Sequence, residues 1–292
     1  MSESIKSENK VLACVDMSHY ADHVADYAAW AAQRMTAPLE FLHVIDRSAA
    51  KVAGKDHSGA IGLGAQEKLL DRLSAEDEAS ARESRERGRI FLNRLRERAV
   101  AAGVASVDMR QRWGELPESL VEQEAGVRLV VLGRRGEAAE VTHRDLGRNV
   151  ERIVRAMHKP ILTVTADFTE PRRIMIAFDG GVVTRHGVEL VAASPLFKGL
   201  PIYLLMAGGS VPEGQRQVEW ARERLAAGGF EVTVAIEPGD AETLIARAVK
   251  EQGIDLLIMG AYGHSPLRSL LAGSKTTDLL RSATIPTLLL RG

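Results

Sequence analysis

Two stretches of similar sequence decide the fold: VLACVDMS at residues 11–18 and IMIAFDGG at residues 174–181. Each is a short apolar run that ends at an acidic residue, Asp16 or Asp179, and the two lie 163 positions apart. A continuous apolar run of this length is typical of a strand that is buried on both faces of a parallel sheet. The chain is therefore expected to contain two copies of one unit, each beginning with such a strand.

The remainder of the two copies matches in the same order along the chain. Residues 37–44 match 200–206, residues 107–114 match 232–239, residues 129–136 match 256–263, and residues 160–164 match 286–290. The first copy holds 38 more residues than the second between about residues 44 and 107. Within this insertion, Asp46 to Ser74 is rich in Gly, Ala, Lys, Asp and Ser and predicts a flexible loop. Ala75 to Ala102 is dense in Arg and Glu and predicts a long surface helix.

Within each copy, short apolar runs alternate with amphipathic stretches of helical length. In the second copy we expect strands at about residues 173–178, 201–206, 231–236, 255–259 and 286–291. This order predicts two tandem doubly wound, Rossmann-like α/β domains, each a five-stranded parallel sheet with helices on both faces. We expect the domains at residues 1–168 and 172–292. A short polar segment joins them, and its Pro171 disfavours a helix at the preceding residue.

The composition excludes several classes of partner. The formal net charge is −1, so the chain lacks the overall basic field that favours nucleic-acid binding. The first ten residues are polar, and no uninterrupted apolar stretch is long enough to cross a bilayer. We therefore expect a cytoplasmic protein with neither a nucleic-acid nor a membrane partner. The single cysteine, Cys14, lies in the first apolar run and is expected to be a buried core residue.

Glycines follow the fourth expected strand of the second copy in a pattern that suits a phosphate. Gly260 and Gly263 come directly after the strand and, beyond nine further residues, Gly273 and Ser274 open a helix. Glycine lets backbone amides approach a phosphate without a Cβ in the way, and a helix N-terminus adds positive partial charge. In such sheets, ligands bind beyond the carboxyl ends of the strands, where Asp179 is also expected.

The pattern G-x2-G-x9-G-S, preceded by Met and accompanied by Asp179, resembles the ATP-binding signature of the universal stress protein family. The resemblance is to the tandem bacterial form and covers essentially the whole chain. It implies a stress-response or signalling protein that binds ATP or ADP in its second domain, with Mg2+ as an open question. It also implies nucleotide contacts from a set of residues in this domain: Asp179, Met206, Met259, Gly260, Gly263, Gly273, Ser274, Lys275 and Thr276.

In the arrangement that the resemblance implies, Asp179 lies at the nucleoside end, Met206 offers backbone groups to adenine, and Met259 lines the pocket. The loop residues from Gly260 to Thr276 surround the ribose and the phosphates. Lys275 stands where a small residue is expected, and its ammonium either contacts a phosphate or points to solvent. The resemblance further implies that the domains pair through their last strands, about residues 160–165 and 286–291, while homodimer formation stays open.

The first copy departs from the pattern. Asp16 and Gly133 are kept, but ten residues rather than nine separate Gly136 from Gly147, and an arginine replaces the serine. We therefore expect a degenerate nucleotide loop in this copy. Three arginines of the loop either bind an anion by charge or are solvated: Arg134, Arg135 and Arg148.

Two alternatives to a nucleotide-binding protein stay open. Nothing in the second-copy loop supplies a general base or orients a water, so no catalytic residue is expected and any ATP hydrolysis should be slow. An ATP-dependent nucleotidyl-transfer enzyme is supported by fold analogy alone. A nucleotide-independent scaffold would dock through the helix at residues 75–102. A Walker P-loop is excluded because Ser274 separates Gly273 from Lys275.

The histidines suggest no further site. His19 and His23 are spaced to share a helix face, with Asp22 and Asp26 nearby, which is a spacing that suits a metal. No third ligand is evident, so a solvated helix face is the better interpretation. His43 lies within an expected strand, where a core histidine with a hydrogen-bond partner is the better interpretation.

Overall fold

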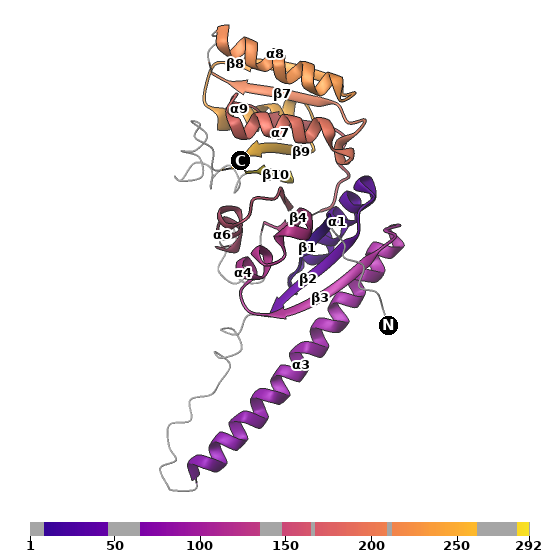
Figure 1. Ribbon diagram of the computed structural model, residues 1–292, viewed down its shortest axis with the longest axis vertical. Helices are drawn as coiled ribbons and strands as arrows, with labels where there is room; N and C mark the ends of the chain where they lie inside the picture. Colours follow the sequence, from indigo (N-terminus) through magenta and orange to yellow (C-terminus); the bar gives the residue numbers. More distant parts are fainter. Residues whose placement is uncertain are drawn as a thin grey trace.

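The computed structural model describes residues 9–45, 65–134, 148–164, 167–208, 212–261 and 285–291. Strands and helices alternate through these ranges, as Figure 1 shows. The predicted α/β class is confirmed.

The described part of the first half contains five strands and the helices between them. In chain order these are β1 (Lys10–Cys14), α1 (Ala21–Met35), β2 (Leu39–Ile45), α3 (Ala65–Ala101), β3 (Val107–Trp113), α4 (Leu116–Val121), the 3-10 helix η1 (Glu124–Gly126), β4 (Val127–Gly133), α6 (Arg148–Ala156) and β5 (Ile161–Val164).

The described part of the second half repeats this plan in a shorter form. Its elements are β6 (Ile174–Ala177), α7 (Val182–Ala193), the 3-10 helix η2 (Pro195–Phe197), β7 (Ile202–Ala207), α8 (Pro212–Ala227), β8 (Val232–Glu237), α9 (Ala241–Glu251), β9 (Leu256–Gly260) and β10 (Thr287–Leu290). The five strands predicted for this half are confirmed to within one residue at each end.

All ten described strands form one sheet with the order β3-β2-β1-β4-β5-β10-β9-β6-β7-β8. Neighbouring strands are parallel within each half, and the two halves meet where β5 and β10 pair antiparallel, with Leu162 opposite Leu288. The predicted pairing of the last strands is therefore confirmed. Because that junction is antiparallel, the carboxyl ends of the strands lie at opposite ends of the sheet in the two halves.

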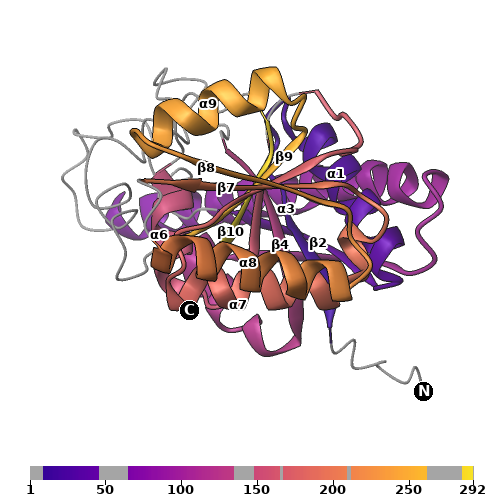
Figure 2. The same ribbon diagram turned by 90° about the horizontal axis from the view of Figure 1, so that it is seen from above.

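Helices cover both faces of the sheet. Figure 2 shows α9 on one face of the second half and α7 and α8 on the other. One apolar core lies on the face covered by α1, α3, α7 and α8, and it includes buried residues of both halves. A second core lies on the face covered by α4, α6 and α9 and also includes both halves. Both cores are thus shared between the two copies.

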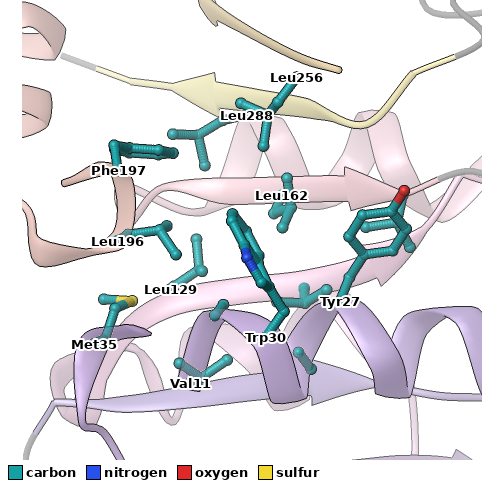
Figure 3. Packing of buried hydrophobic residues seen from close by; sticks show 14 of the residues in the cluster. Val11, Tyr27, Trp30, Met35, Leu129, Leu162, Leu196, Phe197, Leu256 and Leu288 are labelled. Carbon is teal, nitrogen blue, oxygen red and sulfur yellow. The ribbon is translucent and has the colours of Figure 1, made fainter. Parts of the chain in front are cut away.

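The junction between the halves is apolar on the α1 side. Trp30 of α1 is buried in the same core as Leu196 and Phe197 of η2 in the second half (Figure 3). Leu162 and Leu288 from the paired strands join this core. Because these side chains belong to one core, the junction between the halves is continuous with the interior of each half. Burying each large apolar side chain contributes about 1.5–3 kcal/mol relative to exposure, so the junction stabilises the pairing of the halves.

The insertion differs from its prediction at the start of its helix. Helix α3 begins at Ala65, whereas the composition predicted a loop through Ser74 and a helix from Ala75. Residues 65–74 are mostly Ala, Gln, Glu, Lys and Leu, which favour helix, and this propensity outweighs the loop-like polar composition. The rest of the predicted loop, residues 46–64, lies outside the described residues. Figure 1 shows the N-terminal part of α3 extending away from the sheet.

Helix α3 is attached to the first half through its C-terminal part. Leu92, Leu95 and Ala99 are buried in the core under this helix. At Gly88 the helix approaches the sheet so closely that a Cβ would lie 2.9 Å from Cδ of Gln111 and 3.3 Å from Cδ2 of His43. Glycine at this position therefore allows α3 to pack directly on β2 and β3.

Candidate functional site

The carboxyl ends of three neighbouring strands meet where the strand order of the second half reverses. β6 lies between β9 and β7 in the sheet, with Ala177 of β6 opposite Met259 of β9. Asp179 follows β6, Met206 lies near the end of β7, and Gly260 ends β9. A reversal of this kind is where open α/β sheets bind ligands. The structure thus brings four of the predicted residues to one edge of the sheet.

Asp179 is held by the turn that it begins. Its Oδ1 accepts hydrogen bonds from the N–H of Gly181 at 2.9 Å and from Oγ1 of Thr184 at 2.5 Å. Gly180 has a φ of 75°, which glycine adopts without strain, and Gly181 is the N-cap of α7. The half-buried carboxylate is therefore fixed at the positive end of the α7 dipole.

Gly260 is crowded by the first turn of α7. A Cβ at this position would lie 3.2 Å from Cγ1 of Val183 and 3.3 Å from Cγ2 of Thr184. Thr184 therefore lies against both strand ends: its methyl group is next to Gly260 after β9, and its hydroxyl donates to Asp179 after β6. The sequence pattern explains glycine at this position by the close approach of a phosphate, and the structure shows that packing against α7 also requires a residue without a Cβ. No local sequence pattern indicates that second role, because it depends on how α7 lies on the sheet.

The other described residues at this edge are buried. Met259 packs in the core on the α9 face, and Met206 packs in the core on the opposite face. Ala261 is fully buried, and its N–H donates to the carbonyl of Leu290 at 2.6 Å. The remaining predicted contacts lie outside the described residues and stay predictions: Gly263, Gly273, Ser274, Lys275 and Thr276.

The corresponding edge of the first half keeps the acidic turn. Oδ1 of Asp16 accepts hydrogen bonds from the N–H of Ser18 at 3.2 Å and from its Oγ at 2.5 Å. The backbone bond from the second residue after the aspartate is shared with the Asp179 turn, but the hydroxyl donor here is that same residue, Ser18, whereas at Asp179 it is Thr184 of α7. Gly133 ends β4, whereas Arg135, Gly136 and Gly147 lie outside the described residues.

Arg134 has a role that the sequence did not predict. The expectation was an anion ligand or a solvated loop residue, but Arg134 is buried, with 5% of its surface exposed. Its Nη2 donates to the carbonyl of Ile285 in the second half at 3.1 Å, and its backbone N–H donates to Val164 at 2.9 Å. The solvated interpretation is therefore wrong, because the side chain turns inward to the junction between the halves. The second half has Ala261 at this position of the repeat.

Comparison with known proteins identifies the family. The model of the universal stress protein family matches residues 8–165 and 206–291, which is more than half of the chain. The chain belongs to the universal stress protein family. Universal stress protein Slr1230 of Synechocystis sp. is 33% identical to it over 284 residues, which cover 96% of this chain and 99% of that protein.

Solved structures of universal stress proteins share the fold over the full length. One from Archaeoglobus fulgidus DSM 4304 has a TM-score of 0.68 at 16% identity, covering 98% of this chain and 97% of that one. A putative universal stress protein from Pseudomonas aeruginosa UCBPP-PA14 has a TM-score of 0.59 at 20% identity, covering 98% and 94%. At these identities the likeness shows the tandem α/β fold of this universal stress protein.

The acidic residues near His19 and His23 serve to attach a helix in this universal stress protein. Asp22 of α1 forms an ion pair with Arg94 of α3 at 2.8 Å, and Asp26 forms one with Arg98 at 2.6 Å. The hydrogen bonds that Arg98 donates to the carboxylate of Asp26 raise the pKa of Arg98, which keeps this pair charged. No group of three potential metal ligands occurs among the residues that the structure describes.

The first-half strands hold Cys14 and His43 in the interior. Cys14 is a buried free cysteine, as predicted, and burial is the main cause that raises the pKa of its thiol to about 12. His43 is also buried, and its Nδ1 lies 3.0 Å from the carbonyl of Val15. The prediction of a core histidine with a hydrogen-bond partner is confirmed. Within the described ranges, no helix has the length and apolar character needed to span a membrane.

Proposed function

We propose that this universal stress protein binds ATP, or ADP, at the second-half edge formed by β6, β7 and β9. Asp179, Met206, Met259 and Gly260 would form the nucleoside end of the site. The loop with Gly263, Gly273, Ser274, Lys275 and Thr276 would hold the phosphates, with Mg2+ as their counterion. Occupancy of this site would bias the conformation or the partner choice of a stress-response protein.

One observation carries the proposal: a fixed carboxylate and a glycine lie at adjacent strand ends, at the reversal of strand order. Asp179 and Gly260 follow paired residues of β6 and β9, and Thr184 contacts both. The glycine-rich pattern G-x2-G-x9-G-S begins at Gly260, so the segment that we propose to hold the phosphates would start at this edge. The site residues described so far fit an adenine nucleotide because they supply an acceptor at one end and the start of a glycine-rich loop beside it.

We further propose that the carboxylate of Asp179 faces the six-position of the purine, an orientation that would favour adenine over guanine. An ionised aspartate only accepts hydrogen bonds, and the six-position of adenine carries an amino donor. Guanine carries a carbonyl oxygen at that position, and two acceptors facing each other repel. ATP should therefore bind more tightly than GTP at Asp179.

Calorimetric titration of the full chain with ATP and Mg2+ tests the proposal through an isosteric pair of variants. Asp179→Asn keeps an oxygen that accepts from Gly181 and Thr184 but removes the charge, so ATP affinity should fall about tenfold, as expected for a charge-assisted hydrogen bond. Asp16→Asn makes the same change in the first-half turn and should leave the affinity unchanged. Absence of binding by the unaltered protein at millimolar ATP, or equal losses in both variants, would contradict the proposal.

A further inference from the structure

Arg291 crosses from the second half to the end of a first-half helix. It directly follows β10, and its Nη1 donates to the carbonyl of Met157 at 3.2 Å and to the carbonyl of Arg155. Arg155 lies in the last turn of α6 and Met157 directly follows this helix, at the end where the last carbonyls have no partner within the helix. A cation is favourable at a helix C-terminus, so a guanidinium of the second half caps a helix of the first half.

A continuous series of contacts joins this arginine to the second-half edge. The carboxylate of Asp179 binds Thr184, and Thr184 packs against Gly260. The residue after Gly260, Ala261, donates its N–H to Leu290, the neighbour of Arg291 in sequence. Each step is a hydrogen bond, a van der Waals contact or a peptide bond between described residues. A displacement of Asp179 or Gly260 would therefore shift the backbone at Leu290 and the position of Arg291.

Arg134 makes the corresponding contact in the opposite direction. It follows the β4 residue Gly133 at the first-half edge, and it donates to Ile285 just before β10 of the second half. Thr163 supports the same junction, since its buried hydroxyl donates to the carbonyl of Thr287 at 3.1 Å. Each half therefore extends an arginine from its own strand-end edge to the segment that precedes the last strand of the other half.

Helix α6 is the element that such a link would affect. It begins at Arg148, directly after the degenerate loop of the first half, and ends at the carbonyls that Arg291 caps. Its buried residues Val150, Ile153 and Val154 hold one face on the sheet. The last turn of a helix frays readily when its carbonyls lack partners, so the cap sets how often this turn opens.

We propose that Arg291 couples the two edges: nucleotide binding in the second half tightens the cap on α6 and so stabilises the first-half edge. This inference rests on the proposed function, because it takes the second-half edge as the nucleotide site. It assigns the first half a regulatory role in which its degenerate edge responds to a nucleotide bound elsewhere. Because coupling free energies are reciprocal, weakening the cap also weakens nucleotide binding.

Hydrogen exchange of the full chain, read by mass spectrometry on peptides covering residues 148–157, tests the coupling. In the unaltered protein, saturating ATP with Mg2+ should slow exchange of these amides by about two- to thirtyfold, the range that corresponds to typical coupling free energies between sites. In Arg291→Ala, exchange should be faster without ATP, and ATP should no longer slow it. Arg291→Lys keeps a cation near the carbonyls and should restore part of the response, which guards against a merely unfolded alanine variant.

Arg34→Ala provides a matched control. Arg34 also crosses between the halves to backbone carbonyls, those of Leu196 and Lys198, but it lies at the end of α1 and away from the series of contacts described above. This variant should keep the ATP response of α6. The coupling is wrong if ATP binds the unaltered protein without slowing α6 exchange, or if Arg291→Ala responds as the unaltered protein does. Absence of ATP binding in calorimetry would instead overturn the proposed function, and the coupling with it.

Discussion

Arg134 and Ala261 occupy the same position of the repeat, directly after the glycine that ends the fourth strand of each half. Ala261 is small and buried and donates its backbone N–H to β10 of its own half. Arg134 makes the equivalent backbone bond to β5 and also sends its side chain into the other half. The repeat predicts the shared backbone role. It does not predict the direction of the arginine, because that depends on the neighbouring half rather than on adjacent residues.

The buried thiol of Cys14 should make the free energy of unfolding decrease at high pH. Burial chiefly, and then the charge of Glu40, raises the pKa of its thiol from 9.0 to about 12. Between these values the unfolded chain releases a proton that the folded chain keeps. The free energy of unfolding contributed by this group is therefore fully present below pH 9 and declines as the pH rises, by at most about 1.4 kcal/mol per pH unit.

Urea unfolding of the unaltered protein and of Cys14→Ala between pH 8 and pH 11 measures this contribution. The alanine variant is less stable at pH 8 because it lacks the buried sulfur, but its stability should decline less steeply above pH 9. Comparison of the two slopes removes the contribution of lysines and tyrosines, which titrate in both proteins. Parallel slopes would show that the thiol is accessible enough to ionise in the folded chain.

At the scale of elements, strands were easier to predict than the inserted helix. The second-half strands are short apolar runs between turn residues, and both faces are covered, so their boundaries coincide with the apolar pattern. Helix α3 has no comparable signal at its start, because its N-terminal part mixes charged residues with Leu69, Leu70 and Leu73 and lies away from the sheet. The start of this helix depends on backbone propensity summed over many residues, which composition alone does not resolve.

The two sides of α3 should respond differently to the same truncation. Leu95 is fully buried, so Leu95→Ala should lower the free energy of unfolding by about 2–5 kcal/mol through lost burial and an incompletely filled cavity. Ile90 lies on the same helix with 58% of its surface exposed, so Ile90→Ala should change it by less than about 0.5 kcal/mol. Chemical denaturation measures both. Similar losses would mean that α3 packs on the sheet through a different face.

At the scale of the whole molecule, the two halves form one sheet and share both cores. The tandem arrangement and the pairing of the last strands were predictable from the repeat and from the family resemblance. The asymmetry of the two edges was predictable only as a change of loop spacing and the loss of a serine. The contacts that cross the junction, from Arg34, Arg134 and Arg291, were not, because they join residues more than 130 positions apart.

Native mass spectrometry of the full chain with added ATP and Mg2+ tests the central claim most directly. We predict one adenine nucleotide for each chain of 31.7 kDa, with occupancy at a given ATP concentration that falls in Asp179→Asn, in line with an about tenfold weaker affinity, and stays unchanged in Asp16→Asn. A chain that stays free of nucleotide at millimolar ATP, or an occupancy that is unchanged in Asp179→Asn and falls in Asp16→Asn, would contradict this prediction.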